Sequence, residues 1–393
     1  PNPELKYLRR WAMDAGIDTL TYSITGGNGE AAFAIDSETG AITVADTTQL
    51  DFDDAEFLTL EVQVADDDGG TGTAQVTINL LNQASITGEV FVDVNQNGLY
   101  DANEPGIDDV IIELLDEFGM PVLDDLGNPI TATTANGGFY LFEDLDIGTY
   151  QVHEVQPTGV DDGPEILGTI DGQLAGTIVA NDMMQLELAR ADAADYVFAE
   201  LGQQVASGDA ATIGFWHNKH GQALITQGGT ALAQWLTANF DNVFGDEFVG
   251  ADGTGVARFF NDQLFKQVGK KSAGPAKVDA QFMAVALATY FTSSNLAGNV
   301  ATEYGFNVTD TGIGTRVVNV GSGGAAFEVA DNTDLTIMQL LQATNALTDL
   351  PDGISGFAHI YDANGDGQID DAEAALRVMA NGVYSTINEQ GDV

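Results

Sequence analysis

The stretch ITGEVFVDVNQNGLYDANE, residues 86–104, joins a segment of alternating apolar and polar residues to a twelve-residue acidic loop. The alternation over residues 86–93 predicts a β-strand with one buried face. The loop, residues 93–104, carries short oxygen-bearing side chains at positions 1, 3, 5 and 9, Gly at position 6 and Glu at position 12. At this spacing oxygen atoms surround a calcium ion, glycine permits a sharp bend, and the final glutamate supplies two oxygens. The expected ligands are Asp93, Asn95, Asn97, the Leu99 carbonyl, Asp101 directly or through water, and Glu104.

A second segment, DANGDGQIDDAE at residues 362–373, follows the same rule. An amphipathic run over residues 374–387 follows it and predicts a helix. Strands flank the first loop, so we expect it to stabilise structure rather than to open a groove as signalling sensors do. We therefore expect calcium as the cofactor at two separate sites. The second set of expected ligands is Asp362, Asn364, Asp366, the Gln368 carbonyl, Asp370 and Glu373.

Charge is strongly unbalanced, with 60 acidic against 12 basic residues and a formal net charge of -48. No Lys or Arg occurs between Arg10 and Arg190, so the carboxylates of that half need counter-ions or bound cations. A phosphate backbone would be repelled, which argues against a nucleic-acid partner. Acidity that serves only solubility, as in a halotolerant or marine protein, is also compatible with this composition.

Cysteine is absent, which excludes disulfides, thiolate zinc sites and cysteine nucleophiles. No run of eighteen apolar residues suggests a membrane span. The start, PNPELKYLRRW, has no apolar signal core. We expect an extracellular or cell-surface protein whose export signal is removed or not included, and in which calcium replaces disulfides as a stabilising element.

Residues 17–82 alternate apolar and polar positions between turn clusters, which predicts the strands of an antiparallel β-sandwich. The strings FAIDSETGAITV, LDFDDAEFLTLEVQVADDDGG and TAQVTINLLN resemble the later part of a cadherin-type repeat of bacterial surface proteins. The first strand region is replaced by PNPELKYLRRWAMDAG, and the acidic linker is reduced to Asn82 and Gln83. The aspartates that either supply part of a calcium site or lie in solvated loops are Asp14, Asp51, Asp53, Asp66 and Asp68.

A second β module is predicted from strands in ITGEVFVD, DVIIELLDE, ITATTANGGFYLFEDL, GTYQVHEV and ADYVFAEL. Their order, with the loop at residues 93–104, resembles the calcium-binding B repeats of staphylococcal surface proteins and the related collagen-adhesin B-type domains. Many such relatives are stapled by a Lys–Asn isopeptide bond. This module contains no lysine, so the resemblance implies that the calcium loop takes over the stabilising role.

From about residue 206 the apolar residues recur every three or four positions, which predicts helices. We expect a small hairpin with strands at residues 316–320 and 325–329 joined by GSGG, and a helix over residues 335–347. GFWHNKHGQALI and the ending ALRVMANGVYSTINEQGDV resemble an uncharacterised C-terminal domain of exported planctomycete-type proteins. The loop at residues 362–373 resembles an EF-hand or half of a dockerin, although dockerins carry two such loops in tandem.

Other chemistry is sparse. His217 and His220 are spaced to share a helix face as metal ligands, or else to pack beside Trp216. No nucleophile elbow or phosphate-binding loop occurs, and acidic pairs are too abundant to mark glycosidase carboxylates. The basic residues between Lys266 and Lys277 fit a solvated helix end, or a surface that attracts the acidic β modules of another copy.

We therefore predict a multidomain, non-enzymatic protein: two antiparallel β-sandwiches (residues 1–83 and 84–203), then a mainly α-helical domain (204–393) with a small hairpin and one EF-hand-like loop. The predicted function is structural or adhesive, with self-association into a surface layer or fibre by strand exchange or head-to-tail contacts. The alternative is a carbohydrate-binding or anchoring module of an extracellular polysaccharide-degrading system. Metal-dependent hydrolysis is a third and more distant reading.

Overall fold

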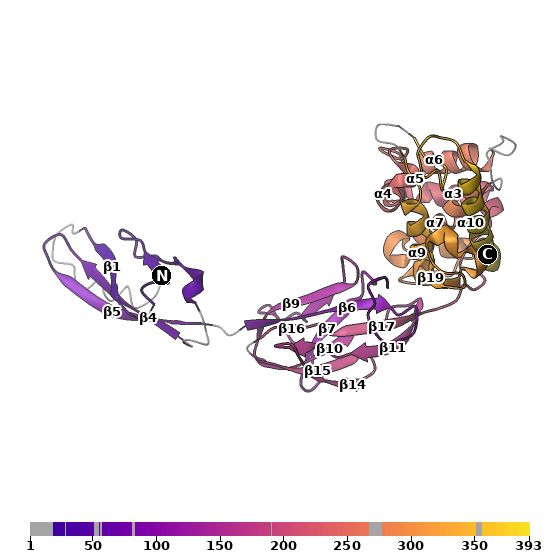
Figure 1. Ribbon diagram of the computed structural model, residues 1–393. Helices are drawn as coiled ribbons and strands as arrows, with labels where there is room; N and C mark the ends of the chain where they lie inside the picture. Colours follow the sequence, from indigo (N-terminus) through magenta and orange to yellow (C-terminus); the bar gives the residue numbers. More distant parts are fainter. Residues whose placement is uncertain are drawn as a thin grey trace. The chain divides into compact units, whose positions relative to one another are not determined.

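The computed structural model describes residues 19–27, 29–50, 55, 57–80, 83–189, 191–266, 277–350 and 356–393. The chain divides into two compact units. The first contains the chain up to Ser85 with the short segments 143–148 and 188–192, and the second contains the remainder. Figure 1 labels their helices and strands.

Two small antiparallel sheets form the first unit. β4 pairs with β1 on one side and with β5 on the other, and β2 pairs with β3. Along β4 every second residue from Leu58 to Val64 is buried, as expected for a strand with one face against a core. The structure thus has the sandwich-like sheets that the alternation predicts. The strands are β1 (Thr21–Gly26), β2 (Phe33–Ile35), β3 (Ile42–Val44), β4 (Phe57–Ala65) and β5 (Thr71–Asn79).

The turn between β4 and β5 holds Asp66 and Asp68. The Asp66 carboxylate accepts hydrogen bonds from the backbone N–H groups of Asp68 (3.2 Å) and Gly70 (2.6 Å). Asp66 therefore closes the turn with its own side chain. The other aspartates of the cadherin-like pattern, at positions 14, 51 and 53, lie outside the described residues, as does the replaced first strand region.

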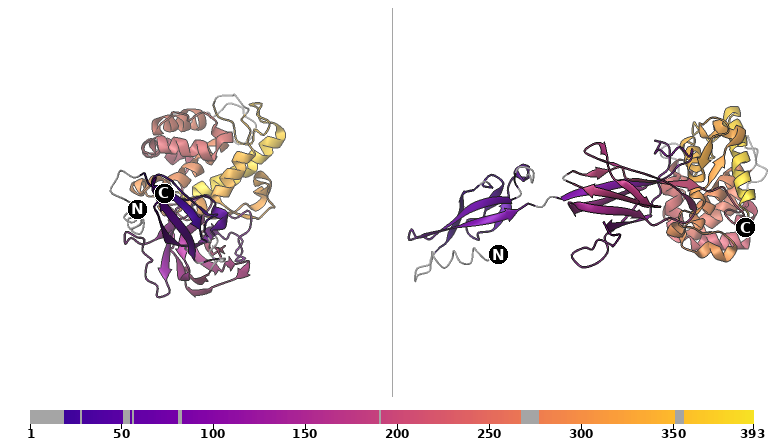
Figure 2. Two further views of the ribbon diagram at one scale, coloured as in Figure 1. Left: turned by 90° about the vertical axis from the view of Figure 1, so that its left-hand side faces the viewer. Right: turned by 90° about the horizontal axis from the view of Figure 1, so that it is seen from below.

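The B-type module, which follows, also consists of two sheets (Figures 1 and 2). One sheet has the order β14-β15-β10-β7-β8, and the other has β11-β17-β6-β16-β12-β13 with β9 also paired to β6. The five predicted strand regions all contain strands. The strands are β6 (Gln83–Val92), β7 (Ile111–Asp116), β8 (Thr131–Thr133), β9 (Phe139–Asp146), β10 (Gly148–Glu154), β11 (Val160–Ile166), β12 (Thr169–Ile170), β13 (Gln173–Leu174), β14 (Thr177–Ala180), β15 (Met183–Leu188), β16 (Ala193–Ala194) and β17 (Val197–Gly202).

β6 and β17 lie side by side in parallel, with Val90 opposite Phe198. Both residues are buried, as are Ile112, Leu114 and Val152 from the other sheet. Apolar side chains at alternate positions of the two sheets therefore form the core of the sandwich. The sequence analysis does not predict the strands between β10 and β17, several of which contain only two residues.

The helical region confirms the change of periodicity near residue 206. α7 is buried on nearly every side and packs against α10 (Figure 1). Among the helices in the described ranges, none has the length and apolar composition needed to cross a membrane. The helices are α2 (Ile213–His217), α3 (Lys219–Gln227), α4 (Gly229–Asn239), α5 (Asp241–Phe244), α6 (Gly253–Phe259), α7 (Val278–Thr292), α8 (Ser294–Ala297), α9 (Ile337–Ala346) and α10 (Asp371–Gln390), with a π-helical segment η2 (Phe260–Phe265) and 3-10 helices η3 (Val300–Tyr304), η4 (Gly312–Thr315) and η5 (Gly321–Phe327).

The predicted hairpin is wrong in its second strand. β18 (Val317–Asn319) pairs with β19 (Asp334–Thr336), whereas the segment expected to supply the partner strand mostly lies in the 3-10 helix η5. Phe327 is buried in the helical core, and a Cβ on Gly324 would lie 2.5 Å from the Ala330 carbonyl oxygen. Tertiary packing thus favours a tight helical turn over an extended strand at this glycine-rich segment.

Candidate metal centres

In the first loop the acidic residues at positions 1 and 12 are buried, and their carboxylates accept hydrogen bonds from the loop backbone. Asp93 is 2% and Glu104 9% exposed. The N–H of Gly98 donates to Asp93 Oδ2 (2.7 Å), and the N–H groups of Val94 and Asp101 donate to the two oxygens of Glu104 (2.9 and 3.1 Å). The first and last positions thereby close the loop on itself.

The second loop repeats these three bonds at the same positions. The N–H of Gly367 donates to Asp362 Oδ2 (2.9 Å), and the N–H groups of Ala363 and Asp370 donate to the two oxygens of Glu373 (3.0 and 2.8 Å). Asp362 and Glu373 are also buried. The two loops, which lie in unrelated surroundings, therefore adopt one hydrogen-bonding scheme.

Side-chain oxygens at positions 3 and 5 complete the scheme. In each loop the position-3 oxygen accepts from the N–H of position 5, and the position-5 oxygen accepts from the N–H of position 7. These bonds fix the side-chain conformations at positions 3 and 5. The bonds are Asn97 N to Asn95 Oδ1 (3.0 Å), Leu99 N to Asn97 Oδ1 (2.7 Å), Asp366 N to Asn364 Oδ1 (2.9 Å) and Gln368 N to Asp366 Oδ1 (2.8 Å).

Backbone conformation agrees between the loops. Positions 4 and 6 have positive φ in both: Gln96 (55°) and Gly98 (69°) in the first, and Gly365 (65°) and Gly367 (75°) in the second. Only glycine adopts this region without cost, and the other residues that tolerate it best are short polar ones. Gln96 is therefore a strained position that the surrounding hydrogen bonds maintain.

Asp101 differs from its counterpart in the second loop. Its Oδ2 accepts hydrogen bonds from the Nδ2 groups of both Asn95 and Asn97 (2.8 Å each), which lowers the pKa of the Asp101 carboxyl. Asp370 is instead the N-cap of α10, and it forms a reciprocal capping box with Glu373. The second loop thus leads directly into a helix, whereas the first runs between strands.

Asp362 has an acceptor that nothing satisfies. Its Oδ1 is buried and receives no hydrogen bond, while burial raises the pKa of the carboxyl. Burial likewise raises the pKa of Glu104. A buried carboxylate oxygen without a hydrogen-bond donor fits a bound cation better than it fits a turn without one.

A buried ion pair anchors the segment before the second loop. Arg377 of α10 is 1% exposed, and its two terminal nitrogens donate to the Asp279 carboxylate at the start of α7 (3.1 and 2.9 Å). Asp279 also accepts from the backbone N–H of Ile360 (2.9 Å) and contacts His359 Nδ1 (3.0 Å). Against the opposing effect of burial, His359 and Arg377 hold the pKa of Asp279 well below its usual range.

A third group of carboxylates was not predicted from the sequence. One oxygen from each of Glu154, Asp182 and Glu200 lies within 4.8 Å of the others, and Asp162 and Glu165 form an overlapping group with Asp182. Neither group includes a loop carboxylate, so the acidic groups of the loops are spaced more widely. We refer to Glu154, Asp182 and Glu200, with Asp162 and Glu165 beside them, as the acidic cluster.

The alternating pattern of two strands could have predicted part of this cluster from the sequence. Glu154 lies two residues after the buried Val152 in β10, and Glu200 lies two residues after the buried Phe198 in β17. Residues two apart in a strand share a face. A glutamate on the buried face of two predicted strands, in a module without lysine, therefore marks an unusual site.

The two histidines do not share a helix face. His217 ends α2 and His220 lies in α3, with Asn218 as the N-cap between them. His217 stacks on Phe265 with a centroid distance of 3.8 Å, and its Nδ1 contacts the amide oxygen of Asn261 (2.6 Å). His217 thus has the packing role that the sequence analysis gave as the alternative to metal binding.

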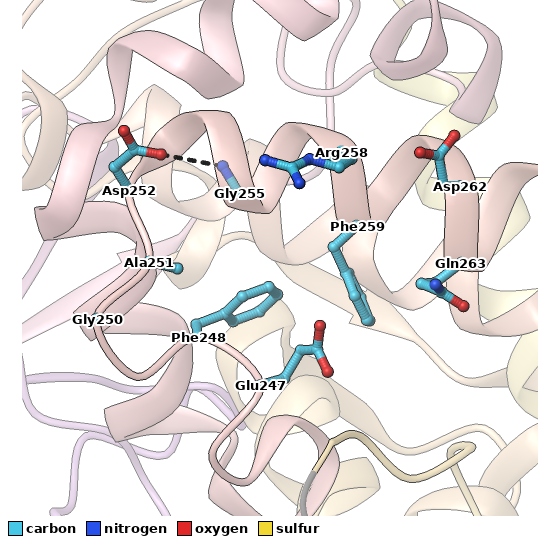
Figure 3. A pocket seen from close by; sticks show the side chains of 10 residues that line it. All are labelled: Glu247, Phe248, Gly250, Ala251, Asp252, Gly255, Arg258, Phe259, Asp262 and Gln263. Carbon is cyan, nitrogen blue, oxygen red and sulfur yellow. Dashed lines mark hydrogen bonds between the residues drawn. The ribbon is translucent and has the colours of Figure 1, made fainter.

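A pocket of about 550 Å³ lies beside α6 (Figure 3). Glu247, Arg258 and Asp262 line it together with the rings of Phe248 and Phe259. Both rings are buried and pack edge to face at 5.1 Å, so they offer no exposed face on which a sugar could stack. The pocket therefore does not favour the carbohydrate-binding alternative.

The comparisons identify the central module. Residues 84–193 match the family model of the SdrD B-like domain. This match confirms the B-type module predicted from the sequence, and it describes a structural rather than a catalytic kind of domain. Among curated proteins, none matches the chain.

Solved structures give weaker likenesses. The chain is 16% identical to BcpA, the major pilin subunit of Bacillus cereus, over 47% of this chain and 58% of the pilin, with a TM-score of 0.23. The group B streptococcus pilus 2b backbone protein is 12% identical over 48% of this chain and 80% of its own, also at 0.23. Protocadherin gamma B7 is 19% identical over 37% of each chain, at 0.15. TM-scores of this size do not define a common fold across the aligned length.

Proposed function

We propose that this chain is a calcium-stabilised structural or adhesive protein of the cell surface or extracellular space. The observation that carries the proposal is the agreement of the two loops, which share five hydrogen bonds position by position. The first loop runs between strands and the second leads into a helix, yet their hydrogen bonds are the same. This agreement supports a common ligand rather than two unrelated acidic turns.

Calcium would be held by the twelve residues named from the sequence. The unsatisfied Oδ1 of Asp362 supports this assignment, because a cation supplies the positive partner that the protein does not. Loops of this type in extracellular modules have dissociation constants of about 0.1–1 mM. At a tenfold excess of calcium over the dissociation constant, each site adds about 1.4 kcal/mol of stability.

The match to the SdrD B-like domain supports a surface location for the central module. The finer assignments belong to the same proposal: a cadherin-like first module, a C-terminal domain of planctomycete type, and a loop at residues 362–373 that resembles an EF-hand or half of a dockerin. For the last of these, the support is a calcium-type loop followed at once by the long helix α10.

Self-association is the proposed mode of action. Within the described part of the first module, β1 and β5 are the edges of a three-stranded sheet. An edge strand presents unpaired N–H and C=O groups to which a strand from another copy can add. Assembly into a fibre or surface layer would then need modules kept stiff by bound calcium.

Electron microscopy of the purified chain in 5 mM calcium and in EGTA tests this function, together with thermal melts under both conditions. We expect ordered assemblies and a higher melting temperature in calcium. The double variant Glu104→Gln/Glu373→Gln should lose the assemblies and the part of the rise in melting temperature that the two loops supply, whereas the matched charge change Asp125→Asn/Asp371→Asn should retain both effects in full. Monomers alone in calcium would contradict self-assembly, and binding on a glycan array without assembly would instead support an anchoring module.

A further inference from the structure

The acidic cluster differs from the many carboxylates on this chain because its central members are buried. Glu154 and Glu200 are each 1% exposed. Neither oxygen of Glu154 receives a hydrogen bond, and the Oε1 of the nearby Gln156 is also buried and unsatisfied. Burying ionised carboxylates side by side without a positive partner is strongly unfavourable. The sandwich therefore requires something at this position that the protein chain does not provide.

The carboxylates of the cluster raise one another's pKa values, in addition to the effect of burial. Burial, and then the charges of Glu200 and Asp182, raise the pKa of Glu154 to about 10. Burial raises the pKa of Glu200 to about 8 and that of Asp182 to about 6. Arg190 is the one basic Lys or Arg residue in the sequence of the B-type module. Either protons or a cation must compensate the cluster.

We infer that Glu154, Asp182 and Glu200 form a third site for a hard divalent cation of the calcium class. A proton on Glu154 would supply a single O–H donor, whereas both buried oxygens of Glu154 lack a donor and Glu200 Oε2 accepts only a neutral amide N–H from Gln156 (2.5 Å). A cation with oxygen ligands satisfies several acceptors at once. The proposed metal ligands are all carboxylate oxygens, and one oxygen from each carboxylate lies within 4.8 Å of the others.

The position of the site gives it a structural consequence. Glu154 belongs to β10 in one sheet of the sandwich and Glu200 to β17 in the other, so a shared ion joins the two sheets. The backbone of Glu154 also donates to the Asp182 carbonyl (2.9 Å), which holds the β14–β15 turn beside it. The Glu200 carbonyl accepts from the N–H of Asp93 (2.8 Å), the first position of the calcium loop. The third site and that loop are therefore one hydrogen bond apart.

This inference stands on its own geometry and holds whether or not the two loops bind calcium. The test uses the full chain carrying Glu104→Gln and Glu373→Gln, which removes the loop sites. Bound calcium is measured by equilibrium dialysis against calcium chloride at 0.1–5 mM, and melting is followed in calcium and in EGTA. Glu154→Gln is added to this background, with Glu187→Gln as the control because Glu187 is exposed on β15 of the same module.

The loop-deficient chain should bind one saturable calcium ion and melt at a higher temperature in calcium. Adding Glu154→Gln should abolish that ion and its thermal shift while raising the melting temperature in EGTA, because the free-energy cost of protonating or burying that carboxylate is removed. Glu187→Gln should change neither. If Glu154→Gln does not fold, Asp182→Asn at the half-buried turn replaces it. Retention of the bound ion in the folded Glu154→Gln chain would overturn the inference. Equal losses of calcium in Glu154→Gln and in the control Glu187→Gln would also overturn it. So would the absence of saturable calcium binding in the loop-deficient chain.

Discussion

Glu373→Gln in the second loop provides the most direct test of calcium binding. Glu373 is 6% exposed, and its two oxygens accept from the N–H groups of Ala363 and Asp370. Glutamine keeps one oxygen but places an NH₂ group against the other N–H. The variant should therefore lose about 1–3 kcal/mol even without calcium, as expected when a buried donor is left unpaired. For that reason the informative quantity is the shift caused by calcium, not the melting temperature itself.

The size of the calcium-induced shift in melting temperature follows from the expected dissociation constant. A dissociation constant of about 0.1–1 mM gives about 1.4–2.7 kcal/mol of stabilisation at 10 mM calcium. In a unit of this size 1 kcal/mol moves the melting temperature by about 2–4 °C, so the shift should be about 3–10 °C. Trp216 and Trp235 both lie in the helical region, so tryptophan fluorescence reports mainly on the part that contains the loop.

Glu373→Gln should abolish this shift, and Asp371→Asn should preserve it. Asp371 is exposed at the first turn of α10 and lies outside the expected ligand set, so it carries the same charge change without touching the loop. An undiminished calcium shift in the folded Glu373→Gln chain would refute the assignment of the loop.

Three further predictions concern other parts of the chain. Glu104→Gln should reduce the calcium-induced stabilisation of the B-type sandwich, measured by hydrogen exchange in β6, while Asp125→Asn should leave it intact. Arg377→Met should cost about 3–5 kcal/mol in denaturant melts by removing the guanidinium partner of the buried Asp279, and adding Asp279→Asn should recover much of the loss. The third prediction is measured in saturating calcium and concerns His359, whose pKa is raised chiefly by its hydrogen bond with Asp279. Folded His359 therefore binds its proton more tightly than the unfolded chain does, and this contribution to stability is present below pH 6.5 and lost as pH rises through the folded pKa. Denaturant melts between pH 6 and 8.5 should show this loss in the wild type but not in His359→Gln.

Periodicity predicted most of the fold. Alternation along β4 and β6 and the three-to-four spacing along α10 each reflect one buried face, which a sequence displays directly. The hairpin after residue 316 failed because a glycine-rich segment has little preference of its own. Packing of Phe327 into the helical core made it helical, and β18 paired instead with the more distant β19.

The local geometry of both twelve-residue loops was determined by the sequence, because their donors, acceptors and glycines lie within a few positions of one another and need no distant partner. The acidic cluster was decided only by the tertiary structure. Glu154, Asp182 and Glu200 come from segments far apart in the chain, and pairing of the two sheets brings them together away from water. Burial then changes the chemistry of these carboxylates, because the loss of solvation makes each ionised group depend on its neighbours.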